Sequence, residues 1–200
     1  MTKLSIRHYG LWLCAMIAFS STSFGQQKYE LHPLVGRTAP TKWADHYSLK
    51  SVSILGVRGG MFYNDTTQVE GEFEYLPHFE FRGTDPKNRA FVWGISLSRN
   101  IFLPKSENVV PYFSFGVGGV TVRTESGQQS VTVLPDRTVT LDNNDTFFAL
   151  NYGVGIKKLH LSGPVGLRAN VVGHTLPNFF SRANSWAEIS GGLIFTWGDR

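Results

Sequence analysis

Apolar and polar side chains alternate with a period of two along most of the chain after residue 26. The clearest stretch is VEGEFEYLPHFEFR at 69–82, where aromatic residues take odd positions and four glutamates take even ones. A helical repeat does not persist for two turns anywhere in this region. A period of two is typical of a β-strand with two unlike faces. The pattern therefore predicts an all-β protein.

Eight such segments follow one another, and each is long for a strand. They cover residues 28–37, 51–63, 68–82, 90–103, 110–124, 147–161, 164–177 and 185–197. A tilted strand needs ~9–11 residues to cross a bilayer, whereas strands of soluble proteins usually have ~5–6. We therefore expect an eight-stranded antiparallel up-and-down transmembrane β-barrel. The alternative is a soluble lipocalin-like barrel, which would keep its apolar face inside, around a ligand.

The connections between these segments alternate in length. The odd connections are 38–50, 83–89, 125–146 and 178–184, and the even ones are 64–67, 104–109 and 162–163. Outer-membrane barrels have short periplasmic turns and longer outer loops, so both termini are expected on the periplasmic side. In the longest connection, SVTVL and RTVTL flank Pro135-Asp136. Two alternating stretches about a turn predict a hairpin that extends beyond the membrane.

The first 25 residues are expected to be a signal peptide. Lys3 and Arg7 precede the short apolar run LWLCAMIAF, and small residues follow it up to Gly25. This order is typical of a secretory signal, and the run is too short to span a bilayer. Cleavage after residue 25 would remove the one cysteine and two of the 19 basic residues, leaving 17 against 15 acidic ones in 26–200. So small a surplus gives no support for nucleic-acid binding.

Charged side chains occupy the strand face opposite the aromatics, and we expect this face to line the barrel. Eight strands enclose a space just wide enough for side chains to fill. The expected polar network comprises Glu70, Glu72, Glu74, Glu80, Glu188, Arg58 and Arg168, with Glu30, Lys157, Arg82, His32 and His78 on the same face. Because unpaired buried charges are unfavourable, we interpret it as an ion-pair plug. Interleaved bases argue against a metal site, and no cofactor is expected. Arg99 is out of phase and is expected near the interface or after a bulge.

The last expected strand ends in SGGLIFTW, residues 190–197. Its Ser190, Gly192, Phe195 and Trp197 resemble the signal by which the outer-membrane barrel assembly machinery takes its clients. Together with VPYFSFGVGG at 110–119, it makes residues 26–200 resemble the small OmpA-like outer-membrane β-barrel proteins. The resemblance implies a bacterial outer-membrane barrel without a peptidoglycan-binding domain. It does not imply one activity, because members serve as anchors, adhesins, immune-evasion proteins or lipid-modifying enzymes.

Catalytic residues are not expected in this chain. Lipid A deacylases of this architecture carry His-x-Ser on the penultimate strand, whereas His174 is followed by Thr175 and Leu176. A rearranged triad with Ser181 and Glu188 keeps such an enzyme as an alternative, and a narrow pore is another. We expect a structural or surface-interaction protein of the adhesin or anchor type. Its expected partners are outer-membrane lipids, lipopolysaccharide and a protein at loop 125–146, and not nucleic acid.

Overall fold

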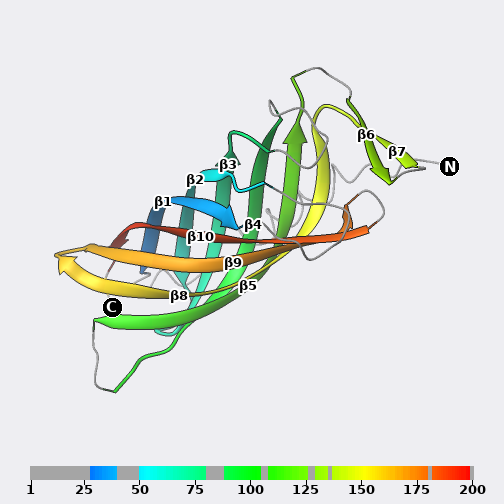
Figure 1. Ribbon diagram of the computed structural model, residues 1–200. Helices are drawn as coiled ribbons and strands as arrows, with labels where there is room; N and C mark the ends of the chain where they lie inside the picture. The colour runs from blue at the N-terminus through cyan, green and yellow to red at the C-terminus, as the bar shows by residue number, and fades with distance from the viewer. Residues whose placement is uncertain are drawn as a thin grey trace.

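Eight long antiparallel strands close into a barrel in the computed structural model of the chain (Figure 1). The structure describes residues 28–39, 50–79, 88–104, 108–125, 129–134, 137–179 and 182–198. The barrel strands are β1 (Tyr29–Ala39), β2 (Ser53–Phe62), β3 (Thr67–Leu76), β4 (Arg89–Asn100), β5 (Val109–Arg123), β8 (Asp145–Ser162), β9 (Val165–Phe179) and β10 (Arg182–Trp197). Each pairs with its neighbour in the chain, and β10 pairs with β1 to close the cylinder. The predicted up-and-down barrel is confirmed.

Two further strands lie outside the barrel, within the longest connection. β6 (Gln129–Leu134) and β7 (Arg137–Leu141) pair antiparallel as a separate two-stranded sheet. This is the hairpin predicted about Pro135-Asp136, and it lies at the far end of the molecule from the C-terminus (Figure 1). We call this end of the barrel the loop end, and the end where β1 begins and β10 finishes the terminus end.

Two expectations about the loop end were wrong. β3 stops at Leu76 rather than at residue 82, because Pro77 has no N–H to continue the ladder. The alternation is lost there, so His78 is exposed and Phe79 is buried, the reverse of the expected faces. The expected seven-residue connection 178–184 is also wrong. β9 ends at Phe179 and β10 begins at Arg182, so the connection is much shorter than expected. The register shifts between Arg182 and Asn184, where β9 has one more residue than β10.

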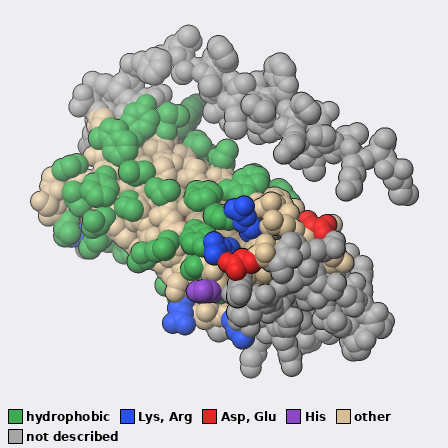
Figure 2. Space-filling model, turned by 90° about the horizontal axis from the view of Figure 1, so that it is seen from above, with side chains coloured by type: hydrophobic (Ala, Val, Ile, Leu, Met, Phe, Trp, Pro, Cys, Tyr) green, Lys and Arg blue, Asp and Glu red, His purple; other side chains and the backbone are tan. Residues whose placement is uncertain are grey.

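The outer wall of the barrel is apolar along its middle. Val35, Phe115, Val154 and Ile189 are among many large hydrophobic side chains that are about half exposed or more. Figure 2 shows hydrophobic side chains spread over one broad face, with the charged ones gathered near one end. Within the described residues, no helix has the length and apolar character to cross a membrane. The strand faces therefore carry the apolar surface expected of a wall in contact with lipid.

Aromatic and hydroxyl side chains lie along the two borders of this apolar band. At the terminus end, the rings of Tyr29 and Trp197 stack with centroids 6.0 Å apart. Toward the loop end, Trp93 Nε1 donates to Thr121 Oγ1 at 3.2 Å. In a second pair there, the Tyr152 and Thr175 hydroxyls lie 3.2 Å apart. Such girdles are typical of the two interfaces of membrane barrels.

Arg99 lies at the terminus end of β4, where its side chain is exposed. It pairs with Thr67 and Phe113 in ladders without a register shift. The bulge considered for this residue is therefore absent from these ladders, and a position at the strand end agrees with the other expectation, a place near the interface.

The barrel interior is divided into a polar zone and an apolar zone. The apolar zone fills the loop end with Leu34, Val52, Ile54, Leu76, Phe79, Ala90, Val92, Val120, Val122, Ala149, Leu176, Phe179 and Trp186. Ring contacts run through this zone, for example between Phe147 and Phe179 with centroids 4.7 Å apart. The charged strand face was expected to line the barrel, whereas at the loop end the lining is apolar. The charged residues lie beneath this zone, toward the terminus end.

Candidate functional site

Arg168 on β9 is the centre of one half of the charged interior. Its guanidinium donates to both oxygens of Glu70, each at 2.9 Å, and to Glu30 Oε1 at 3.1 Å. Its Nε donates to the Tyr112 hydroxyl at 2.7 Å, and its charge lies 4.4 Å from the centre of that ring. Lys157 reaches the other Glu30 oxygen at 3.0 Å. Four strands, β1, β3, β8 and β9, thus contribute charged side chains that are buried and paired with one another.

Tyr112 takes this position because the opposing residue on β8 has no side chain. A Cβ on Gly155 would come within 2.5 Å of the tyrosine ring. The ring therefore lies over the glycine backbone, a packing by which an aromatic side chain covers a strand glycine. This arrangement brings the phenol oxygen to Arg168 and the ring beneath Lys157, whose Nζ is 5.1 Å from the ring centre.

Arg58 on β2 is the centre of the other half. Its Nη2 donates to Glu74 Oε1 at 2.7 Å and to Glu188 Oε1 at 2.9 Å, and its Nε is 3.4 Å from Glu72. Arg58 is 3% exposed, and the Glu74 and Glu188 side chains are not exposed at all. One cation therefore holds carboxylates from two strands that lie on either side of the β1–β2 pair.

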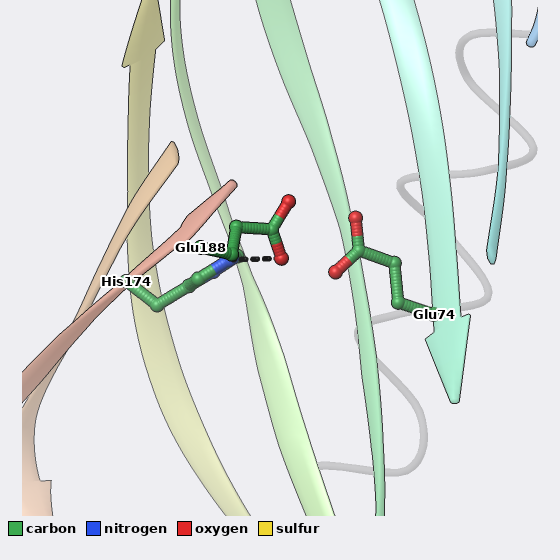
Figure 3. A group of neighbouring side chains, drawn as sticks. All are labelled: Glu74, His174 and Glu188. Atoms are coloured by element: carbon green, nitrogen blue, oxygen red, sulfur yellow. Dashed lines mark hydrogen bonds and ion pairs between the residues drawn. The ribbon is translucent and has the colours of Figure 1, made fainter. Parts of the chain in front are cut away.

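His174 also belongs to this half of the interior, beside Glu188 and Glu74 (Figure 3). Its Nε2 lies 3.3 Å from Glu188 Oε2, and its Nδ1 lies 3.0 Å from Asn151 Oδ1. The imidazole stacks on Trp186, with ring centroids 5.2 Å apart. Trp186 belongs to the apolar zone, so His174 stands at the boundary between the two zones.

The buried charges of the described interior do not balance. Five carboxylates face three permanent cations: Glu30, Glu70, Glu72, Glu74 and Glu188 against Arg58, Lys157 and Arg168. His32 and His174 are also fully buried there. Among the described residues neither ring nitrogen of His32 has a hydrogen-bond partner. The network therefore carries an excess of two negative charges unless protons or other cations join it.

Most of the residues expected in the lumen network meet there. Arg58, Glu72, Glu74 and Glu188 form one half, and Arg168 with Glu70 forms the other. Glu80 and Arg82 lie outside the described residues. Sequence reasoning missed Tyr112, Asn151 and Gln68, which connect the charged groups. Their inward phase on the strands is visible in the sequence, but their contacts cross the barrel between strands far apart in the chain.

The closing strand β10 carries the four residues assigned to the assembly signal. Ser190 faces the interior, where it accepts a hydrogen bond from Asn170 and donates one to Glu188. Gly192 faces the backbone of β1, and a Cβ there would collide with the Pro33 carbonyl oxygen. Phe195 pairs with Leu31, and Trp197 with Tyr29. These residues therefore form the seam where the barrel closes.

The residues considered for a catalytic triad do not form one among the described residues. His174 and Glu188 are adjacent, but both are completely buried inside the barrel. Ser190 Oγ bonds to Glu188 rather than to the imidazole, and Ser181 lies outside the described residues. A nucleophile must lie within hydrogen-bond reach of its base. A lipid substrate would approach the outer wall of the barrel, and His174 and Glu188 are buried away from that wall.

Comparison with solved structures places this barrel among known ones. Neisserial surface protein A is 12% identical, with a TM-score of 0.56 over 86% of this chain and 98% of that one. OprG, an outer membrane protein of Pseudomonas aeruginosa, is 11% identical, with a TM-score of 0.55 over 85% and 95%. Ail, the attachment invasion locus protein of Yersinia pestis, is 12% identical, with a TM-score of 0.51 over 86% and 99%.

The fold is that of a small outer-membrane β-barrel. No family model matches the chain. No curated protein matches its sequence either. The likeness is therefore one of architecture, and the role of this barrel has to be argued from its own residues.

Proposed function

We propose that this protein is a non-enzymatic barrel of the bacterial outer membrane that serves as a structural or surface-interaction protein of the adhesin or anchor type. The observation that carries the proposal is the β6–β7 hairpin, which forms its own sheet outside the barrel. Each of its strands pairs with the other one, so each has a second edge without a strand partner in the described part of the chain. Such edges accept an extended segment of another protein.

The proposal includes an orientation. The loop end with the hairpin faces the cell exterior, and the terminus end faces the periplasm, as the unequal connections favour. The Trp93–Thr121–Thr146 hydrogen bonds on the outer wall, at 3.2 and 2.9 Å, then lie at the level of lipopolysaccharide head groups. Outer-membrane lipids and lipopolysaccharide are the proposed surroundings, and the barrel assembly machinery is the proposed partner of β10 during insertion.

The interior supports this choice over a pore and over a lipid A deacylase. A pore needs an open path, whereas buried ion pairs and the apolar zone fill the described interior. A deacylase needs its base at the lipid-facing wall, whereas His174 is completely buried within the barrel. The adhesin or anchor role requires only a stable cylinder and an exposed surface, and the long strand ladder supplies the former.

The test exchanges residues 126–144 for a short Gly-Ser turn, which leaves β5 and β8 intact. The shortened protein is expected to insert normally but to lose at least about tenfold of its binding to host-cell monolayers or purified lipopolysaccharide. Mass spectrometry of lipid A in the expressing cells is expected to show intact acyl chains. Unchanged binding after the exchange, or loss of an acyl chain that depends on His174, would overturn the proposal.

A further inference from the structure

We propose that the barrel interior holds a divalent cation of the Zn²⁺ type between Glu74, His174 and Glu188. These residues project inward from β3, β9 and β10, and their carboxylates and imidazole converge on one point (Figure 3). One ligand atom from each lies within 4.8 Å of the other two. A small closure of these side chains would bring the atoms to zinc-ligand distances of about 2.0–2.2 Å.

The orientation of His174 is the one found for metal-binding histidines. Asn151 uses its amide Nδ2 to donate to Glu72, so its Oδ1 accepts from the His174 Nδ1–H at 3.0 Å. The lone pair of a neutral imidazole is then on Nε2, which faces Glu188 Oε2 at 3.3 Å. A lone pair and a carboxylate oxygen repel one another at this distance unless a proton or a metal cation lies between them. The Glu72–Asn151 pair corresponds to the outer shell that fixes the tautomer of a histidine ligand.

Glu74 gives an independent indication of a missing partner. Arg58 occupies the Oε1 atoms of Glu74 and Glu188. Glu74 Oε2 has no hydrogen-bond partner among the described residues, although the side chain is completely buried. The two carboxylates face one another across the gap (Figure 3). A buried carboxylate oxygen without a partner is strongly unfavourable, and a cation in this gap would satisfy it.

The charge balance fits a divalent ion. The described interior has two more carboxylates than permanent cations, so one M²⁺ neutralises it with both histidines uncharged. Of the bases that argued against a metal in the sequence, Arg58 does lie at this point, but it occupies the Oε1 atoms of Glu74 and Glu188 and not their Oε2 atoms. Lys157 and Arg168 pair with Glu30 and Glu70 in the other half of the network. One imidazole with two carboxylates is a ligand set that suits Zn²⁺ better than Mg²⁺ or Ca²⁺.

For the test, the full-length protein is extracted from membranes, unfolded in the presence of a chelator and refolded in detergent with Zn²⁺ or Mg²⁺. The metal content of the refolded protein is then measured. About one zinc ion per chain is expected after washing, with a higher unfolding temperature in Zn²⁺ and not in Mg²⁺. His174→Gln is expected to lose both effects. His32→Gln is the matched control, because His32 is an equally buried lumen histidine outside the cluster.

Asn151→Leu is expected to weaken zinc binding by about 10- to 100-fold while leaving all three ligands in place. If His174→Gln does not refold, Glu74→Gln decides, because its amide oxygen can still accept from Arg58. Zinc content in the wild type no higher than in the His174 or Glu74 variant overturns the proposal. Equal loss of zinc in His32→Gln also overturns it. Either result would mean that bound protons balance the network.

Discussion

Arg168 and Glu70 are joined across the barrel by two parallel hydrogen bonds, Nη1 to Oε1 and Nη2 to Oε2, each 2.9 Å long. The two residues come from β9 and β3, which are not neighbours in the sheet. The pair therefore links opposite walls through the interior, independently of the backbone ladder. This geometry is the strongest form of an arginine–carboxylate contact.

The first prediction is that Arg168→Gln destabilises the folded barrel by about 3–5 kcal/mol, because Glu70 loses its bidentate partner while buried and Lys157 is left as the one cation beside Glu30 and Glu70 in the described interior. Urea-dependent unfolding in lipid vesicles measures the effect. Arg89→Gln is the matched control, since Arg89 and Glu125 pair at 2.7 Å but are both 48% exposed. That change is expected to alter stability by no more than about 1 kcal/mol. Equal effects of the two substitutions would contradict a structural role of the buried network.

The barrel and the inward position of its charges could be predicted from the sequence because alternation is a local property. Glu70, Glu72 and Glu74 must share one face of any strand, and a closed cylinder offers that face only one interior. The same reasoning could not separate the two zones of the interior. Leu76 shares the phase of the glutamates, yet its environment is apolar because other strands supply Leu176 and Val122 to the same buried cluster.

Contacts across the barrel were beyond sequence reasoning for a physical reason. Which inward side chains meet depends on the register and tilt of strands far apart in the chain. Asn151 lies between His174 and Glu72 only because β8, β9 and β3 reach the same level of the cylinder. Phe79 was assigned to the wrong face because the ladder ends at Pro77, after which alternation no longer applies.

The second prediction concerns location. The protein is expected to fractionate with outer membranes and to migrate faster on a gel before boiling than after it, since a closed barrel resists detergent. The half-exposed apolar side chains of the outer wall, such as Val154 and Ile189, need a lipid environment. Recovery of the folded protein in the soluble periplasmic fraction, bound to an apolar ligand, would instead support the lipocalin-like alternative.

The third prediction concerns the closing strand. The double substitution Phe195→Ser and Trp197→Ser is expected to block insertion and to leave degraded or periplasmic protein. Both residues lie on the strand that closes the barrel, and Trp197 also stacks on Tyr29. Ile189→Ser with Phe115→Ser is the matched control, because it removes two outward apolar side chains beyond the signal residues. Normal insertion of the Phe195/Trp197 variant would remove the argument for an assembly signal.

The fourth prediction is that the reconstituted barrel shows no stepwise conductance in planar bilayers. Two obstacles of different chemistry occupy its interior in series. The ion-pair network lies toward the terminus end, and the apolar zone lies toward the loop end. Trp186 belongs to the apolar zone, and Arg58 belongs to the ion-pair network. Trp186→Ala is expected to lower stability by about 3–5 kcal/mol, as loss of a large core side chain does. Its conductance is still expected to stay low, because Arg58 continues to bridge Glu74 and Glu188 across the interior.

Trp93→Ala separates this effect from a general sensitivity to tryptophan loss. Trp93 lies on the outer wall and is 45% exposed, so its removal leaves both obstacles in place and opens no internal cavity. A smaller change in stability than for Trp186→Ala is therefore expected. Stepwise currents through the wild-type barrel would show that the two zones do not seal it. The protein would then have to be treated as a narrow pore, with Arg58 and Arg168 as the charges that an ion meets on its path.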